Sequence, residues 1–284
     1  MKTLLCCIVR KENRYLREYV EYYERLGFSH ICIYDNNYEG EERIEDAIGD
    51  YVESGFVDIV DYRGRQICQI QAYDECYKRH GGEYDWIAFF DCDEFLTFAE
   101  GGPAGLEEAL SWSGYDGYDA VCVNWMLFTD GGMLEDDGRP VVERFTEPVK
   151  FRFEGNKGMM CLNDVMKAIV RGGLEDVRFF TAHSFKSELK TCNNIGEPTD
   201  HEHGKHPYNY DRMYLRHYQC KTISEFLWKV GRGYPDQPNV TDDYNVRIRS
   251  LFFGQNKVTR EKLMYIRDKV GIDLSKYYPK HLRT

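Results

Sequence analysis

At residues 84–95 the chain reads Tyr-Asp-Trp-Ile-Ala-Phe-Phe-Asp-Cys-Asp-Glu-Phe. A largely apolar run, Trp86 to Phe90, leads directly into the carboxylates Asp91, Asp93 and Glu94. An aromatic-rich apolar run bounded by polar residues is typical of a strand that is buried on both faces. In open α/β sheets, ligands bind outside the carboxyl ends of such strands. The carboxylates therefore fall where a ligand site is expected.

Asp91 and Asp93 are two residues apart, so in an extended chain both side chains point the same way, about 7 Å apart, while Cys92 points to the opposite side. Such a pair can share one divalent cation. Carboxylate oxygens favour Mg²⁺ or Mn²⁺, and these ions commonly take substrate phosphates as further ligands. A charged turn after a strand is the alternative interpretation, and these two residues alone leave it open.

Composition limits the class of protein. The chain has 284 residues with 42% hydrophobic residues, enough for one large α/β domain, or one domain with a sizeable appendage, around a packed core. The net charge of -11 argues against a general nucleic-acid binder, which needs a basic face. A nucleotide ligand remains compatible, because a bound metal ion would neutralise much of the charge of a diphosphate.

The cysteines and the N-terminus point to a reducing cytoplasm. Ten cysteines contain no C-x-x-C pair, which makes structural zinc improbable. The apolar run Leu4–Val9 is too short for a signal segment, and no run approaches the length of a membrane span. We therefore expect a cytoplasmic protein, with the inner face of the membrane as a further option.

Strand-like and helix-like patterns alternate in the first third of the chain. Apolar runs at 3–9, 30–34, 56–60 and 86–90 are separated by helical patterns at 15–26, 41–54 and 66–79. Asn13 is the candidate N-cap of the first helix, and Gly27 is its candidate end. This alternation predicts a Rossmann-like parallel sheet with right-handed crossovers. The polar segments after strands one, two and four should then meet at one sheet edge. These segments are Arg10-Lys11-Glu12, Asp35-Asn36-Asn37 and Asp91-Cys92-Asp93.

The nucleotide motifs of the common dinucleotide and P-loop folds are absent from this half. Asp35, at the end of the second strand, could accept hydrogen bonds from a ribose or a base. Asp-Asn-Asn is equally a good turn sequence, so both interpretations stand.

The second half is less regular. We expect a strand at 120–128 carrying Trp125 and ending in Thr129-Asp130-Gly131-Gly132, and short strands at 166–171 and 179–184, the latter with His183. Helices are expected at 224–231, with a capping box of Thr222 and Glu225, and at 264–270. A loop is expected at 192–208, where His201, His203 and His206 favour a solvated or acceptor-side loop over a zinc site. No domain linker is visible.

Several of these motifs, taken in order, resemble one family. They are Cys7 to Asn13, Tyr34-Asp35-Asn36, Asp91 to Phe95, Asn124 to Phe128, Lys167 to Val170, His183 and Arg216-His217-Tyr218. The chain resembles bacterial glycosyltransferases of the family-2-like group related to glycosyltransferase family 92. The resemblance implies one GT-A domain over 1–284, an α/β fold whose mostly parallel sheet is flanked by helices, with a C-terminal acceptor-side portion. Residues 1–98 would form the nucleotide-binding half and 99–284 the acceptor-binding half.

The resemblance also implies roles for individual residues. The nucleotide-sugar would contact Arg10, Glu12, Asp35, Asn37, Asp91 and Cys92. Mn²⁺ or Mg²⁺ would be held by Asp91, Asp93 and His217, with His183 as the alternative to His217. A neutral imidazole beside carboxylates suits Mn²⁺, although each histidine could instead be a core or loop residue.

The implied reaction is inverting glycosyl transfer, which needs one general base at the acceptor. Asp130 is the candidate base, although the turn Thr129-Asp130-Gly131-Gly132 departs from the Phe-Gly and Ser-rich turn of many relatives. Trp125 and Lys167 are the candidate acceptor-binding residues. Core packing is the alternative for Trp125, and a position near phosphate or on the surface is the alternative for Lys167.

The expected function is metal-dependent transfer of a sugar from a nucleotide-sugar, with uridine favoured over guanosine. The acceptor would be a glycan or a lipid-linked saccharide in the synthesis of cell-surface polysaccharide or lipopolysaccharide, with peripheral contact to a membrane in the lipid-linked case. Two alternatives remain: a catalytically degenerate GT-A domain that binds nucleotides or glycans, and a sugar nucleotidyltransferase. The oligomeric state stays open.

Overall fold

The computed structural model describes residues 1–150, 163, 165–200, 208–233 and 244–282. His201, His203 and His206 of the predicted loop lie outside the described residues. The chain divides into two compact units, each of which is described by itself. The first comprises Met1–Met126 and Arg152–His217, and the second comprises Leu127–Phe151 and Tyr218–Thr284. This division differs from the boundary expected at residue 98.

The described strands are β1 (Thr3–Val9), β2 (His30–Asp35), β3 (Val57–Asp61), β4 (Trp86–Phe89), β5 (Glu94–Phe98), β6 (Ala120–Leu127), β7 (Met166–Arg171), β8 (Phe179–Thr181), β9 (Ser184–Phe185), β10 (Thr191–Asn193) and β11 (Met213–His217). The described α-helices are α1 (Asn13–Leu26), α2 (Glu45–Glu53), α3 (Gln69–His80), α4 (Leu106–Leu110), α5 (Val141–Arg144), α6 (Ile223–Arg232), α7 (Tyr244–Arg247), α8 (Phe253–Gln255) and α9 (Arg260–Val270). Short 3₁₀ or π turns occupy Ser113–Tyr115, Ile248–Phe252, Ser275–Tyr277 and Lys280–Leu282.

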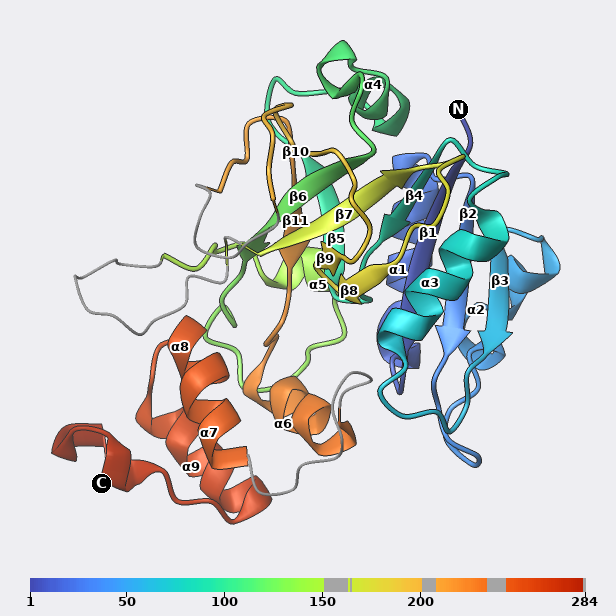
Figure 1. The fold of residues 1–284 in the computed structure, drawn as a ribbon. Coiled ribbons are helices and arrows are strands. Elements are labelled where there is room, and N and C mark those ends of the chain that lie inside the picture. The colour runs from blue at the N-terminus through green and yellow to red at the C-terminus, as the bar shows by residue number, and fades with distance from the viewer. Residues whose placement is uncertain (151–162, 164, 201–207, 234–243, 283–284) are drawn as a thin grey trace. The chain divides into compact units, whose positions relative to one another are not determined.

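The predicted parallel half is confirmed. The strand order begins β3-β2-β1-β4, and the three pairs in this series are parallel. β1 and β4 are buried along their whole length, as their continuous apolar sequences predict. Figure 1 shows α3 lying across one face of these strands, and its apolar residues pack in one cluster with Leu4, Cys6 and Ile8 of β1.

Helix α1 forms the other side of this half. Its buried residues are Tyr15, Leu16, Tyr19, Val20 and Tyr23, which repeat at helical spacing. Two of them connect the helix to the chain around β4, because the Tyr19 hydroxyl donates to the carbonyl of Phe90 and the Tyr23 hydroxyl to that of Glu94. The helix begins at Asn13, with Glu12 and not Asn13 at the N-cap position. It ends as predicted at Gly27, whose φ of 103° is a left-handed conformation that favours glycine.

The sheet continues past β4 as β7-β6-β11-β5, and β10 pairs with β6. β7 is antiparallel to both β4 and β6, and β11 is antiparallel to β5. The predicted α/β class is therefore confirmed, with parallel pairing in the first half and mainly antiparallel pairing in the second. Because β7 starts where β4 ends, Lys167 at the start of β7 lies next to the chain that follows β4.

Three expectations for the second half need correction. Residues 179–184 are not one strand: β8 and β9 form a hairpin, and His183 lies in its turn. The sequence interpretation also missed β10 in a segment expected as a loop, and it missed β5 and β11. These strands are short and not continuously apolar, so their pairing partners rather than their own sequences decide their conformation.

The second unit has a helical core of its own. Cys220 and residues of α6, of the π turn Ile248–Phe252 and of α9 pack in one apolar cluster that also includes Leu274. The predicted capping box is confirmed: the Thr222 side chain accepts from the Glu225 amide, and the Glu225 carboxylate accepts from the Thr222 amide. Within the described residues, no helix combines the length and the apolar character needed to cross a bilayer.

Candidate functional site

The first aspartate of the Asp-x-Asp motif is held by three side chains. Asp91 Oδ1 accepts from Gln69 Nε2 at 2.8 Å and from Tyr73 Oη at 3.1 Å, and Asp91 Oδ2 lies 3.0 Å from Lys167 Nζ. Gln69 and Tyr73 lie one turn apart on α3, and Lys167 lies on β7. Both oxygens of Asp91 are therefore engaged by the protein, although 31% of its side chain remains exposed.

Lys167 connects Asp91 with a second carboxylate, Glu94. Lys167 Nζ lies 3.7 Å from Glu94 Oε2, which also accepts from the Asp91 amide at 2.7 Å. The side chains of Lys167 and Glu94 have no exposed surface. Glu94 Oε1 is buried and has no hydrogen-bond partner among the described residues. The ammonium group thus sits at the base of the carboxylate cluster, closed off from solvent.

The pKa values of the ionisable groups in this cluster shift in different directions. Burial raises the pKa of Glu94 well above its ordinary value. For Asp91, burial opposes ionisation, but the Lys167 ammonium outweighs it and lowers the pKa. For Lys167, burial opposes the charged form, but attraction to Asp91 and Glu94 outweighs it and raises the pKa. Asp91 and Lys167 therefore form a charged pair.

Lys167 is buried, which is not the position expected of an acceptor-binding residue. Its side chain is completely buried, and its ammonium contacts Asp91, Glu94 and the Tyr73 hydroxyl, the last at 3.2 Å. This placement corrects the expectation of a direct contact with an acceptor, because no part of the side chain reaches the surface.

The second aspartate faces a histidine. Asp93 Oδ1 lies 3.5 Å from His217 Nε2, and both side chains are buried. The contact arises because β11 runs antiparallel to β5, with His217 opposite Glu94, the residue after Asp93. The sequence interpretation named this pair as metal ligands, and the structure brings the two side chains together.

Trp125 packs against both candidate histidines. Its ring centroid lies 4.1 Å from that of His217 and 5.0 Å from that of His183. Trp125 is 6% exposed, and its buried Nε1 has no hydrogen-bond partner among the described residues. His183 Nδ1 lies 3.1 Å from the carbonyl oxygen of Met166. The contacts of Trp125 are therefore those of the core-packing alternative, with one ring contact to each histidine.

The donor set fits a divalent ion only in part. Among the described residues, no group of three histidine, cysteine or acidic side chains is arranged to hold a metal ion. One carboxylate and one imidazole, Asp93 and His217, do face each other, and both are suitable ligands for Mn²⁺. An ion bound here would need its remaining ligands from water and from a phosphate-bearing substrate.

The predicted gathering of strand ends is visible around Asp35. β1 and β2 pair in register, with Val9 opposite Asp35. Asp35 Oδ1 accepts from the amide and side-chain nitrogens of Asn37, and Asn37 Oδ1 accepts from the Lys11 amide at 2.8 Å. Asp35 Oδ2 pairs with Arg63 at 2.8 Å. The turn interpretation of Asp-Asn-Asn is thus borne out by these contacts, which bind the two strand ends together.

The other predicted nucleotide-contacting residues are largely buried. Arg10 Nη2 lies 3.3 Å from Glu41 Oε1, and its guanidinium lies 3.9 Å from the centroid of the Tyr38 ring. Glu12 is 7% exposed and Cys92 is 5% exposed. Arg10 is therefore fixed by a charge pair at the end of β1, and contact of Cys92 with a nucleotide would involve its backbone rather than an open thiol.

Asp130 lies in the other unit, away from solvent. It is 3% exposed and forms an ion pair with Lys262, which is 2% exposed. Asp130 Oδ1 also accepts from the Gly132 amide at 2.9 Å, and the Asp130 amide donates to Asn256 Oδ1 at 2.6 Å. These contacts join the turn after β6 to the segment before α9, which is a structural function for this carboxylate.

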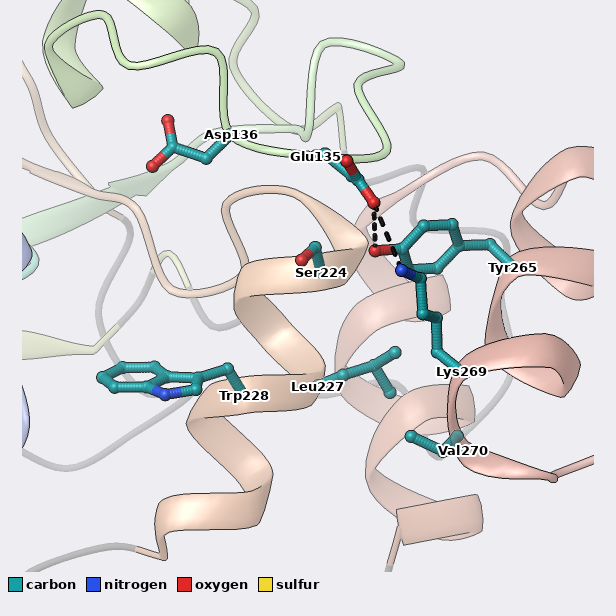
Figure 2. Close-up of a pocket in the computed structure, with 8 residues that line it drawn as sticks. All are labelled: Glu135, Asp136, Ser224, Leu227, Trp228, Tyr265, Lys269 and Val270. Carbon is teal, nitrogen blue, oxygen red and sulfur yellow. Dashed lines mark hydrogen bonds and ion pairs between the residues drawn. The ribbon is translucent and has the colours of Figure 1, made fainter.

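The second unit also contains an open pocket of about 460 Å³. It lies along α6 and α9 and is lined by Glu135, Asp136, Ser224, Leu227, Trp228, Tyr265, Lys269 and Val270 (Figure 2). Figure 2 shows Tyr265 and Lys269 directed at Glu135, with the Tyr265 hydroxyl 2.8 Å and Lys269 Nζ 3.7 Å from Glu135 Oε1. None of the predicted site residues lines this pocket.

Sequence reasoning missed the residues that hold Asp91 and Asp35. Gln69 and Tyr73 looked like ordinary residues of an amphipathic helix, and Arg63 lies in a loop. One signal was present for Lys167: a lone lysine in the apolar run Met166-Lys167-Ala168-Ile169-Val170. A lysine in a buried strand requires a carboxylate partner, because an unpaired buried ammonium is very costly.

Comparison with known proteins agrees with the family drawn from the sequence. The model of glycosyltransferase family 92 matches residues 3–119. A glycosyltransferase family 92 protein of Oryza sativa subsp. japonica is 30% identical over 95 residues, which cover 33% of this chain and 16% of that protein. One of Ricinus communis is 30% identical over 111 residues, covering 37% and 18%. The chain thus spans less than a fifth of the length of these curated relatives.

Similar solved structures share little sequence with this chain. Staphylococcus aureus TarS, residues 1–349, is 12% identical with a TM-score of 0.40, covering 99% of this chain and 82% of that one. The complex of TarS with UDP-GlcNAc is 11% identical with a TM-score of 0.36, covering 48% and 37%. The mannosyltransferase PcManGT from Pyrobaculum calidifontis, in complex with GDP-Man and Mn²⁺, is 12% identical with a TM-score of 0.33, covering 43% and 35%.

Proposed function

We propose, from the premise that residues 3–119 are related to glycosyltransferase family 92, that this chain is a metal-dependent glycosyltransferase that uses a nucleotide-sugar. One observation supports this most directly: Asp93 faces His217 beside a second aspartate that the protein holds in place. The group follows the carboxyl end of β4, where ligands bind in α/β sheets. Among nucleotide-sugars we propose a uridine diphosphate sugar.

The donor would lie along the carboxyl ends of β1, β2 and β4. Asp35 and Asn37 stand at the end of β2, and Asp35 is paired with Arg63, a cation that could also attract phosphate. Arg10 and Glu12 follow β1. Asp35, Asn37 and Arg10 are already fixed by contacts within the protein, so little ordering of these side chains would be needed on donor binding.

Asp93 and His217 would hold the divalent ion, with Asp91 as the neighbouring carboxylate and His183 as the alternative imidazole. When bound, such an ion offsets the negative charge of a departing diphosphate. The orientation of His217 is set by Trp125 on one side and Asp93 on the other. We therefore propose that Trp125 positions the histidine in addition to any contact with an acceptor.

The transfer we propose is inverting. A general base takes the proton of an acceptor hydroxyl while the hydroxyl oxygen bonds to the anomeric carbon of the donor sugar. The bond from that carbon to the diphosphate breaks at the same time. Asp130 remains the candidate base, but it can accept a proton only if its ion pair with Lys262 opens. A glycan or lipid-linked saccharide, in the synthesis of cell-surface polysaccharide or lipopolysaccharide, is the acceptor class we propose, with the protein in the cytoplasm.

The proposal is tested by calorimetry with uridine and guanosine diphosphates and their sugars, each with and without Mn²⁺. Wild type is compared with Asp93→Asn and with Asp268→Asn, a control at a carboxylate whose side chain is 62% exposed on α9. We expect uridine diphosphate to bind more tightly with Mn²⁺ in wild type and in the control, and Asp93→Asn to abolish that gain. Absence of nucleotide binding under every metal condition would refute the proposed function.

A further inference from the structure

A single ammonium group lies buried among the carboxylates of the candidate site. Lys167 Nζ is 3.0 Å from Asp91 Oδ2 and 3.7 Å from Glu94 Oε2, and its side chain has no exposed surface. The sequence interpretation placed this lysine at an acceptor and did not connect it with the Asp-x-Asp motif. Its position on β7, which pairs with β4, makes it part of the sheet rather than of a loop.

The contacts around Asp91 leave it poorly suited to bind a metal ion directly. Oδ1 accepts from Gln69 Nε2 and Tyr73 Oη, and Oδ2 is paired with Lys167. A metal ion on either oxygen would have to displace a donor or lie close to a buried positive charge. The Asp93 carboxylate has a different neighbour, the His217 imidazole, which can itself be a ligand.

We propose that Lys167 is a positioning residue that keeps Asp91 out of the metal's coordination and weakens binding of the free divalent ion until the nucleotide diphosphate is present. The proposal rests on the proposed function, because it assumes an ion held by Asp93 and His217. The physical reason is charge. The fixed ammonium repels a dication beside it, and the negative charges of a diphosphate offset that repulsion.

Metal and nucleotide would therefore bind together rather than independently. At the separations found within one site, loss of a unit charge changes the affinity for a dication by roughly tenfold or more. Lys167 thus lowers the affinity for the free ion, so that Mn²⁺ binding relies on attraction to the phosphates of the donor. That attraction is reciprocal: Mn²⁺ tightens nucleotide binding by the factor by which the nucleotide tightens Mn²⁺ binding.

Electron paramagnetic resonance of free Mn²⁺ measures this directly on the full chain, with and without uridine diphosphate. Lys167→Gln removes the charge and keeps a hydrogen-bond donor, whereas Lys167→Arg keeps the charge. Without nucleotide, we expect Lys167→Gln to bind Mn²⁺ roughly tenfold more tightly than wild type, and Lys167→Arg to resemble wild type. An unchanged or weaker affinity in a folded Lys167→Gln protein would overturn the proposal.

Asp91→Asn supplies a second test, both alone and combined with Lys167→Gln. It leaves the ammonium uncompensated, so we expect weaker Mn²⁺ binding, and the double variant Lys167→Gln/Asp91→Asn should return to the wild-type affinity. A double variant that stays weak would show that Asp91 is a ligand, and the proposal would fall.

The outcomes also separate this proposal from the proposed function. If wild type binds no Mn²⁺ even with uridine diphosphate, the metal site itself is refuted and this inference with it. If wild type binds Mn²⁺ with the nucleotide in a manner that needs Asp93, while Lys167→Gln behaves as wild type without nucleotide, only the inference about Lys167 is refuted.

Discussion

Replacing Arg144 by methionine tests how strongly a buried ion pair stabilises the second unit. Arg144 Nη1 lies 2.9 Å from Glu225 Oε2, and Nη2 lies 3.0 Å from Glu225 Oε1. Their side chains are 1% and 2% exposed. Methionine fills much of the volume of arginine but leaves the Glu225 carboxylate buried without its cation. Breaking a buried pair on one side costs about 3–5 kcal/mol, so we expect a loss of that size in the free energy of unfolding.

Urea unfolding followed by circular dichroism measures the change, with Arg139→Met as the control. Arg139 pairs with Asp137 on the surface, where such pairs contribute about 0–1 kcal/mol. The double variant Arg144→Met/Glu225→Met removes both members of the buried pair, and Asp136, the other partner of Arg144, is 27% exposed. The double variant should therefore be more stable than Arg144→Met, even though loss of the capping box costs about 1 kcal/mol. The reasoning is refuted if Arg144→Met costs no more than the control.

Three further predictions concern other charged and strained positions. Burial opposes ionisation of Glu41, but hydrogen bonds from Arg10 and Lys11 outweigh it and lower its pKa to about 2. This pKa lies below the unfolded value of about 4.3, so the stability contributed by ionised Glu41 is complete above pH ~4.3 and is lost as the pH falls towards 2. The difference in melting temperature between wild type and Glu41→Gln should therefore disappear over that pH range. Asp130→Asn should lower the melting temperature by several degrees, because Lys262 loses its carboxylate partner. An unchanged melting temperature would contradict the ion pair. Turnover of a sugar nucleotide, assayed well below the melting temperature, tests separately whether Asp130 acts as a base. Gly27→Ala should cost about 1 kcal/mol because φ is 103° at the end of α1, and a neutral result in urea unfolding would contradict that strain.

Local sequence was sufficient for the parallel half of the fold and for helix α6. Continuous apolar runs marked β1 and β4, and helical spacing marked α1 with its glycine end and α6 with its capping box. In each case the deciding interactions lie within a few neighbouring residues, so their pattern can be seen in the sequence. The parallel arrangement then followed from the alternation of strands and helices, and it put the strand ends, with Asp35 and Asp91, at one edge.

Residues that meet only through strand pairing were harder to foresee. Asp93 and His217 were chosen as partners from a family resemblance, but their contact depends on β5 and β11, two strands that the sequence did not reveal. Asp130 was grouped with the catalytic residues because it follows a strand, and the structure gives it a buried partner, Lys262, from far along the chain.

The sequence by itself therefore determined which residues form the parallel half and where its carboxylates emerge, because both depend on local apolar patterns. Only the tertiary structure decided what each carboxylate contacts. Lys167 reaches Asp91 because β7 inserts antiparallel beside β4, a pairing set by the burial of whole strands against one another. The charge of that lysine, more than the spacing of the two aspartates, distinguishes the surroundings of Asp91 from those of Asp93.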